Sequence, residues 1–281
     1  MINFFNTKSF HLINPYFILG GFLMFALGVG IAHYLGYPLD WTAYILGQGC
    51  VTCLQLSLVM LTYYFGNFQS QQSFLLPAII TLTLAGILIA WIIKIGYGNP
   101  ELIVILVFSF LLTFIYAVPP LRLINSGYGE LILAVLMANI IPVLAFQLQA
   151  GIIHKLVAMA TFPLTPLYLA MTIAVSLKDY QLDIKSTRIT LLTSLGWERG
   201  MYYHNLLILI GYILIGLSIT FGLPFRIAWV VLLSLPVGFY QVWQMSQIAQ
   251  GAKPHWQLLS FTAMVTFGLT SYLLAFSFWI R

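Results

Sequence analysis

Long apolar runs constrain this chain more than any other feature. A helix needs about 20 mainly apolar residues to cross a bilayer, and runs of that length recur along all 281 residues. They are too long and too continuously apolar for the strands of a transmembrane barrel. The sequence therefore predicts an all-α membrane protein, with residues 1–281 as a single domain. We place nine spans, near residues 16–35, 42–65, 75–95, 101–118, 130–149, 153–176, 202–221, 226–246 and 258–279.

Composition supports this class and excludes others. Only 6% of the residues are charged, against about 25% in soluble domains, so the chain cannot supply a polar surface. The excess of 11 Lys and Arg over 6 Asp and Glu suits contact with anionic membrane lipids. No basic and aromatic patch gathers in the sequence, and we expect no nucleic-acid partner. Cys50 and Cys53 lie inside an apolar run, where we expect packing rather than a redox role.

The distribution of positive charge predicts the orientation. With nine spans, one side receives Lys8, Arg122, Lys178, Lys185, Arg188, Arg199 and Lys253. The other side receives Lys94, Lys155, Arg226 and Arg281. The richer side is expected to be cytoplasmic, which predicts a cytoplasmic N-terminus. We expect a multi-pass protein of a prokaryotic inner (cell) membrane. Its loops are also the longer ones, so we expect a functional site there.

The densest cluster of charge lies in residues 176–188. In a helix, Asp179 and Asp183 are four residues apart and project from one face, about 6 Å apart at Cβ. A shared divalent cation would relieve their repulsion, and Mg²⁺ binds carboxylates while bridging to substrate phosphates. Lys178 and Arg188 flank the pair and could hold the same anion. Alternatively, the basic residues only neutralise two aspartates at a membrane interface, and the spacing alone leaves both interpretations open.

A second polar segment follows the fourth apolar run. Two prolines at 119–120 end that helix, because proline lacks an amide donor and disfavours helix before it. Gly127 and Gly129 allow a tight turn into the next helix. Arg122 is thereby placed at the rim, and Glu130 in the first helical turn, where the helix dipole favours an anion. A purely structural interpretation is a loop with a snorkelling arginine.

These two segments resemble a known family. Tyr-x-Val-Pro-Pro-Leu-Arg-Leu from Tyr116, followed by Gly-x-Gly-Glu, resembles the loop between helices 4 and 5 of the UbiA superfamily of intramembrane prenyltransferases. It is most similar to the branch that prenylates dihydroxynaphthoate or homogentisate in quinone biosynthesis. The segment from Asp179 to Asp183, with Arg188-Ile-Thr-Leu after it, looks like the family's second aspartate motif. The resemblance spans the chain and implies a nine-helix bundle.

The resemblance also implies an activity and roles for the residues. A prenyl diphosphate would donate its isoprenyl group to an aromatic or other lipophilic acceptor, with Mg²⁺ as the cofactor. Asp179 and Asp183 would bind Mg²⁺, and Lys178, Arg122 and Arg188 the diphosphate. The aromatic residues that could line a prenyl tunnel are Tyr116, Tyr168, Tyr202, Tyr203, Tyr240, Trp243 and Phe261. We expect most of them to be packing or interfacial residues instead. Gln241, Gln244 and Gln247 either face the chamber or are interfacial.

The chain departs from the family at the first aspartate motif, Asn-Asp-x-x-Asp-x-x-x-Asp, which belongs at the end of the second helix. In one alignment Thr62 replaces the asparagine, and the three aspartates become Tyr63, Gly66 and Ser70. Shifting by one residue places Asn67 and Gln71 at two acidic positions. Neither alignment leaves a carboxylate, and neutral amides attract a cation more weakly. We treat Asn67 and Gln71 as remnants of the substrate-binding motif.

Three hypotheses follow. The first is a membrane prenyltransferase that works with the remaining aspartate pair. The second is a catalytically inactive UbiA-like binding or assembly protein that lost the first motif. A small-molecule transporter is the third, and the absence of charged residues deep in the spans disfavours it.

Overall fold

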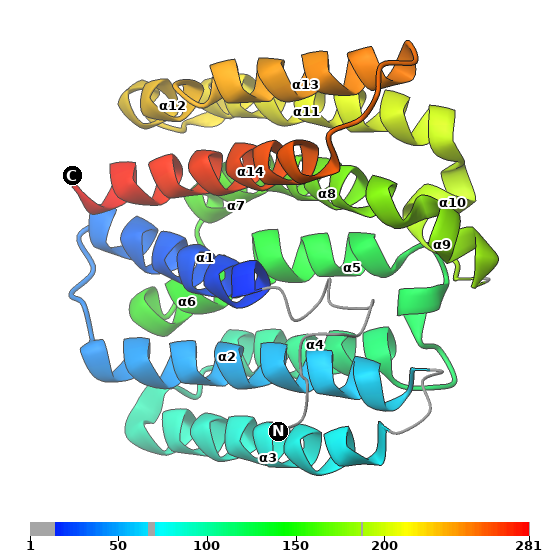
Figure 1. The fold of residues 1–281 in the computed structure, drawn as a ribbon. Coiled ribbons are helices and arrows are strands. Elements are labelled where there is room, and N and C mark those ends of the chain that lie inside the picture. The colour runs from blue at the N-terminus through cyan, green and yellow to red at the C-terminus, as the bar shows by residue number, and fades with distance from the viewer. Residues whose placement is uncertain (1–14, 67–70, 187, 281) are drawn as a thin grey trace.

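The computed structural model describes residues 15–66, 71–186 and 188–280, which form helices and connecting loops without any strand (Figure 1). In this part of the chain, eight segments are long and apolar enough to cross a membrane. A further pair of helices, bent by 42° relative to one another, makes a ninth if the pair crosses as one span. The predicted all-α membrane class is therefore confirmed.

The helices are labelled in chain order, with short 3₁₀ and π segments marked η. They are α1 (Pro15–Tyr34), α2 (Trp41–Tyr64), η1 (Gln71–Phe74), α3 (Leu75–Ile92), η2 (Ile93–Tyr97), α4 (Pro100–Ala117), η3 (Leu123–Asn125), α5 (Gly129–Val135), η4 (Leu136–Ile140), α6 (Ile141–Ala150), α7 (Lys155–Thr161), α8 (Leu164–Ser176), η5 (Leu177–Asp179), α9 (Tyr180–Lys185), α10 (Leu191–Leu195), α11 (Trp197–Phe221), α12 (Phe225–Leu232), α13 (Leu235–Ala249) and α14 (Trp256–Trp279).

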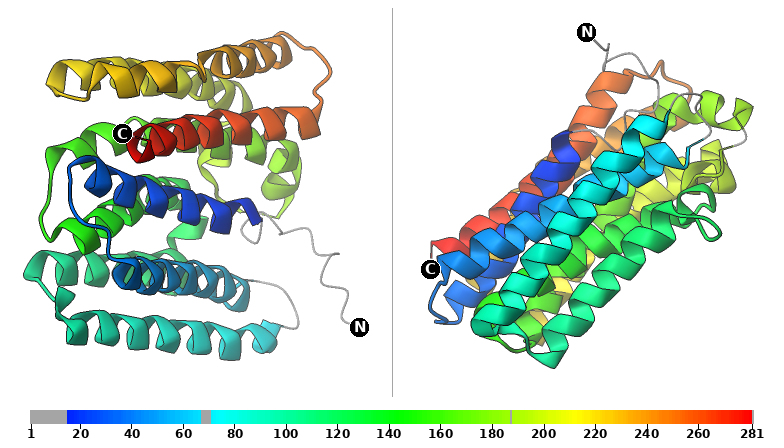
Figure 2. Two further views of the ribbon diagram at one scale, coloured as in Figure 1. Left: turned by 90° about the vertical axis from the view of Figure 1, so that its left-hand side faces the viewer. Right: turned by 90° about the horizontal axis from the view of Figure 1, so that it is seen from below.

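The long helices lie side by side in one bundle, with α3 at one edge and α11 to α13 at the opposite edge (Figures 1 and 2). Helix α2 packs on α3, α1 packs on α6 and α14, and α8 packs on α11 and α14. The spans differ in how much of their most apolar stretch is buried inside the bundle. The buried share is 72% for Gly129–Ala150 but only 17% for Leu75–Tyr97. The segment from α5 to α6 is therefore central, and α3 leaves its apolar side chains exposed.

Near a proline, the structure interrupts three of the spans that the sequence predicts. The span near 130–149 contains the π segment η4 before α6, the span near 153–176 divides between α7 and α8, and the span near 226–246 divides between α12 and α13. Each break comes just before or at a proline, at Pro142, Pro163 and Pro236. Proline removes a helical hydrogen bond and clashes with the preceding turn, which accounts for the breaks.

The charged loops gather at one end of the bundle, on the right in Figure 1. The long connection predicted after residue 176 folds into η5, α9 and α10 before α11 begins. The turn between α4 and α5, with η3, lies at the same end. The two polar segments of the sequence are thus brought together.

A hydrogen-bonded cluster around Asp40 ties the opposite end together. Its carboxylate caps α2 by accepting from the amides of Thr42 at 2.7 Å and Ala43 at 3.1 Å, and it also accepts from the hydroxyl of Tyr97. The Asp40 amide donates to Gln149 Oε1 at 2.8 Å, and Gln149 Nε2 donates back to the Asp40 carbonyl at 3.1 Å. The cluster therefore joins α2 to η2 and α6.

This cluster makes a prediction about acid stability. The hydrogen bond from Tyr97, followed by those from Ala43 and Thr42, lowers the pKa of Asp40 below its usual 3.8. A depressed folded-state pKa stabilises the fold above the unfolded-state pKa, and this stabilisation is lost as pH falls through the folded-state pKa. We expect Asp40→Ala to lower the free energy of unfolding by about 1 kcal/mol at neutral pH. Denaturant unfolding in detergent should show a smaller difference at about pH 3, and an equal difference would contradict this account.

Candidate functional site

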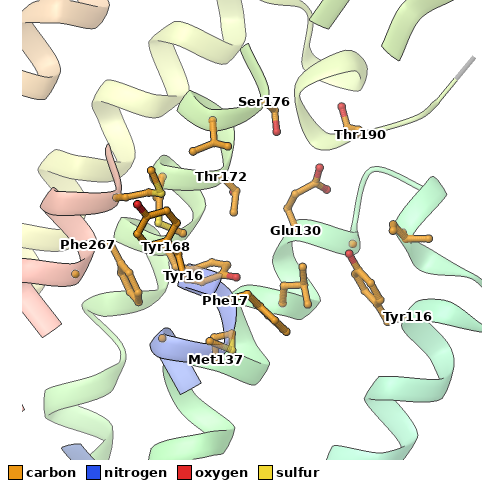
Figure 3. Close-up of a pocket in the computed structure, with 18 of the residues that line it drawn as sticks. Tyr16, Phe17, Tyr116, Glu130, Met137, Tyr168, Thr172, Ser176, Thr190 and Phe267 are labelled. Atoms are coloured by element: carbon orange, nitrogen blue, oxygen red, sulfur yellow. The ribbon is translucent and has the colours of Figure 1, made fainter. Parts of the chain in front are cut away.

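A cavity of about 280 Å³ opens at the end of the bundle that carries the charged loops (Figure 3). Its walls come from α1, α4, α5, η4, α8, α9 and α14. Apolar side chains line most of it, including Phe17, Met137 and Phe267. Its polar end is formed by Asp179, Asp183, Arg188, Glu130 and Thr190. The cavity therefore joins a small charged region to an oily chamber.

The two aspartates of the predicted motif lie on this cavity. Asp179 ends η5 and precedes α9, and Asp183 lies within α9, so the four-residue spacing turns both toward the same space. Asp183 is buried, and Arg188 Nη1 lies 3.7 Å from its Oδ1. The Arg188 amide also donates to the Asp183 carbonyl at 3.0 Å. Arg188 is therefore held against Asp183 by its backbone as well as its charge.

The segment after Arg188 is fixed by a capping box at the start of α10. The Thr193 amide donates to Thr190 Oγ1 at 3.1 Å, and the Thr190 amide donates to Thr193 Oγ1 at 2.7 Å. The carbonyl of Arg188 lies 3.1 Å from the same Thr193 hydroxyl. Such reciprocal caps satisfy amides that the helix leaves free. They position Arg188 and Thr190 on the cavity wall.

Arg122 lies close to Arg188 but does not line the cavity. It follows the cis Pro119–Pro120 bond and has a left-handed backbone (φ 39°), which is strained for a residue with a side chain. Its Nε atom is buried without a hydrogen-bond partner in the described part of the chain. Burial, and then the charge of Arg188, lower the pKa of Arg122. Two guanidinium groups held near one another favour an anion between them.

The other predicted site residues divide into three groups. Tyr116, from α4, is buried and lines the cavity. Lys178 is exposed and is not among the lining residues, because neighbouring helical residues point in different directions. Asn67 lies outside the described residues, and for Gln71 only the backbone, at the start of η1, is described.

Neutral side chains occupy the described end of α2. The family resemblance implies that the first aspartate motif should lie there. The Thr62 hydroxyl donates back to the Leu58 carbonyl at 2.8 Å, within its own helix. Tyr63 is buried and stacks on Phe74, with 5.3 Å between ring centroids. Its phenol lies within electrostatic reach of Arg188. An aromatic ring thus lies beside the charged end of the cavity, at a position where one alignment expects a carboxylate.

Most of the aromatic residues considered for a prenyl tunnel lie elsewhere. Tyr168 joins Tyr116 on the cavity wall (Figure 3). The exposed ones are Tyr202, Tyr203, Tyr240, Trp243 and Phe261. The glutamines of α13 also lie away from the cavity: Gln241 is buried with its Nε2 3.3 Å from His204 Nε2, and Gln244 accepts from Thr262 at 2.7 Å.

Glu130 is a charged cavity residue for which the sequence patterns indicate no role in binding or catalysis. It lies in the first turn of α5, as predicted, and its side chain reaches into the polar end of the cavity (Figure 3). A signal was present, because Glu130 is the acid of the Gly-x-Gly-Glu segment. Helical position alone did not reveal that its side chain would turn inward rather than toward the rim.

The side chains available as ligands limit the kind of metal site that the cavity could form. Among the described residues, no group of three or more His, Cys, Asp or Glu could hold a metal ion. Asp179 and Asp183 supply two carboxylates to one wall of the cavity. Mg²⁺ commonly takes one or two carboxylates and completes its shell with substrate phosphates and water. The pair therefore fits a metal bound together with a phosphate ligand, and not a metal held by protein alone.

Comparison of this fold with known structures finds UbiA homologues. No family model and no curated protein matches the chain by sequence. A UbiA homologue from Archaeoglobus fulgidus bound to GPP and Mg²⁺ superimposes with a TM-score of 0.67 at 16% identity, covering 98% of this chain and 100% of that protein. The same homologue bound to DMAPP and Mg²⁺ gives 0.61 at 14% identity, covering 98% and 99%. The apo UbiA homologue from Aeropyrum pernix K1 gives 0.62 at 13% identity, covering 89% and 96%.

These likenesses extend over nearly the whole chain. They confirm the predicted UbiA-like helical bundle, and with the long apolar helices they identify a multi-pass integral membrane protein. At such low identity they establish the fold alone.

Proposed function

We propose that this chain belongs to the UbiA superfamily, as one domain over residues 1–281, and transfers an isoprenyl group from a prenyl diphosphate to an aromatic or other lipophilic acceptor. The observation that carries the proposal is the meeting of Asp179, Asp183 and Arg188 at the polar end of a mainly apolar cavity. Two UbiA structures that share this fold contain a prenyl diphosphate with Mg²⁺, which is the ligand chemistry such a cavity suits.

The charged end would bind the diphosphate and the metal. Asp179 and Asp183 would hold Mg²⁺, which when bound supplies positive charge to the phosphate oxygens. Arg188 would donate to the same anion, and Arg122 lies near enough to Arg188 to add its charge. Lys178 is exposed, so its positive charge would attract the diphosphate from outside the cavity. With neutral residues at the end of α2, we propose a single metal site rather than two.

The apolar part would hold the isoprenyl group. Phe17, Met137 and Phe267 exclude water from this part of the cavity. Catalysis would require the carbon–oxygen bond of the allylic diphosphate to break, so that negative charge develops on the leaving group. Fixed positive groups aimed at that charge are commonly the largest catalytic contribution. The rings of Tyr116 and Tyr168 line the same space and could stabilise the allylic cation.

The second candidate function is a UbiA-like binding or assembly protein without turnover. The neutral residues at the end of α2 favour it, because the described part of that helix end offers no carboxylate to a second metal ion. Both candidates share ligand binding and differ in product formation. Because the motifs resemble those of the quinone-biosynthesis branch, we propose that the product is a quinone precursor. Because the loops on one side carry more lysine and arginine, we propose that the N-terminus is cytoplasmic.

The proposed function can be tested with the full-length protein purified in detergent. Calorimetric titration with geranyl diphosphate should detect binding with Mg²⁺ and lose most of it in EDTA. Incubation with radiolabelled geranyl diphosphate and a panel of hydroxylated aromatic acceptors should then yield prenylated product. Binding that is absent, or indifferent to EDTA, would refute the proposal. Metal-dependent binding without product from any acceptor would favour the non-catalytic alternative.

A further inference from the structure

Glu130 has a side chain that the proposed diphosphate site does not use. Its carboxyl group points toward the part of the cavity that Ser176 and Thr190 line (Figure 3). The Oε2 atom is buried and has no hydrogen-bond partner among the described residues. A buried polar atom without a partner costs free energy, so a donor from a bound ligand would be stabilising there.

Glu130 also stands apart from the aspartate pair as a metal ligand. The three acids do not form a group that could share one ion, although Asp183 is within electrostatic reach of Glu130. The groups that face Glu130 are Tyr116 from α4, Tyr168 from α8, Asp183 from α9 and Arg188 from the following segment.

The surroundings indicate what kind of donor would bind. Glu130 belongs to the polar end of the cavity, and the rings of Tyr116 and Tyr168 line the same cavity. A flat aromatic molecule could pack against such rings and direct its hydroxyl group to the carboxyl oxygen of Glu130 that has no partner. Glu130 is thus placed beside the region where the isoprenyl group would be released.

We propose that Glu130 binds the hydroxyl group of a hydroxylated aromatic acceptor and takes its proton during transfer, an inference that rests on the proposed function. The allylic carbon–oxygen bond breaks and the diphosphate leaves with the electron pair. A ring carbon of the acceptor bonds to the allylic carbon while the hydroxyl proton passes to the Glu130 carboxylate. The ring carbon then loses its proton to water and the oxygen regains one from Glu130, which restores the aromatic ring and the carboxylate. One proton is released in total.

The proposal predicts that the cavity binds acceptors with a free hydroxyl group more tightly than acceptors without one. An aryl methyl ether has a similar shape but no proton to donate, so it would leave the Glu130 oxygen unpaired. A hydrogen bond to a charged group contributes enough binding free energy for the affinity for the phenol to exceed that for its methyl ether by roughly 10-fold to 100-fold. The acceptor class is therefore a phenol or naphthol and not its ether.

Binding tests the inference without requiring turnover. Full-length protein with Mg²⁺ and the non-ionising analogue geranyl S-thiolodiphosphate is titrated with 1-naphthol and with 1-methoxynaphthalene. The wild type should prefer 1-naphthol by at least about 10-fold. Glu130→Met, which keeps the length without the carboxyl group, should bind both probes equally, with unchanged affinity for the thiolodiphosphate. Glu101→Gln is the matched control, because Glu101 lies in the first turn of α4 at the other end of the bundle.

A second variant separates hydrogen bonding from proton transfer. Glu130→Gln can accept a hydrogen bond but not a proton, so it should keep part of the preference while kcat for 1-naphthol falls by roughly 100-fold or more. A preference retained by Glu130→Met, no preference in the wild type, or an undiminished kcat in Glu130→Gln would overturn the inference. If the wild type binds no thiolodiphosphate but still selects 1-naphthol through Glu130, the proposed function fails while the hydroxyl-binding site stands.

Discussion

Asp179→Asn/Asp183→Asn is expected to abolish the Mg²⁺-dependent binding of geranyl diphosphate, raising Kd by at least about 100-fold, or about 2.7 kcal/mol. Both carboxylates line the cavity, and asparagine offers a metal neither negative charge nor a second oxygen. The variant also removes the carboxylate beside Arg188, which lies 3.7 Å away in the wild type. Residual binding in EDTA should therefore be unchanged or slightly stronger.

The matched control removes two carboxylates from elsewhere. Glu101 and Glu198 lie in the first turns of α4 and α11, and neither lines the cavity. Glu101→Gln/Glu198→Gln changes the net charge by the same amount and should keep metal-dependent binding within about 3-fold. Titration calorimetry with Mg²⁺ and with EDTA measures both variants. If the aspartate variant binds like this control, Asp179 and Asp183 have only a structural role.

Gly28→Ala is expected to destabilise the protein more than the same substitution at any other helical glycine of the described residues. A Cβ atom at Gly28 would lie 2.1 Å from the Pro142 carbonyl oxygen and 2.8 Å from the Cβ of Ala145. The first neighbour is backbone, so α1 and α6 would have to separate. Overpacking of this kind costs about 3 kcal/mol, which exceeds the gain of about 1 kcal/mol in helix propensity.

Gly86→Ala provides the comparison, because a Cβ atom there meets nothing within 4 Å. It gains helix propensity in α3 without a clash, so its unfolding temperature should rise slightly while that of Gly28→Ala falls. Thermal unfolding in the same detergent, followed by the accessibility of Cys50 and Cys53 to a thiol reagent, measures both. Equal shifts in the two variants would show that α1 and α6 approach less closely than described.

The apolar runs sufficed to predict the bundle, because a bilayer allows few alternatives to helices of about 20 residues. The spacing of Asp179 and Asp183 likewise placed both on one wall, since helical periodicity holds over a single turn. The breaks at Pro163 and Pro236 were not predicted. Hydropathy remains high across them, and only the prolines themselves mark the interruption.

Other parts of the site depend on tertiary structure. Arg122 has a left-handed backbone and lies within electrostatic reach of Arg188, and local sequence does not specify this placement. Glu130 turns into the cavity, and Lys178 does not line it. Whether a charged residue at a helix end points inward depends on which helices surround it, and that is decided by packing between segments far apart in sequence.

The contact between Arg188 and Asp183 has a thermodynamic consequence. Under the proposed function, a divalent cation bound at Asp183 would compete with the guanidinium group for the same carboxylate and weaken the attraction that holds Arg188 in place. The guanidinium group of Arg188 would then be free to turn to a phosphate, and a phosphate that engaged Arg188 would leave Asp183 to the metal. Each ligand would raise the affinity for the other by the same factor, as linkage requires. The proposed site would therefore bind both ligands cooperatively.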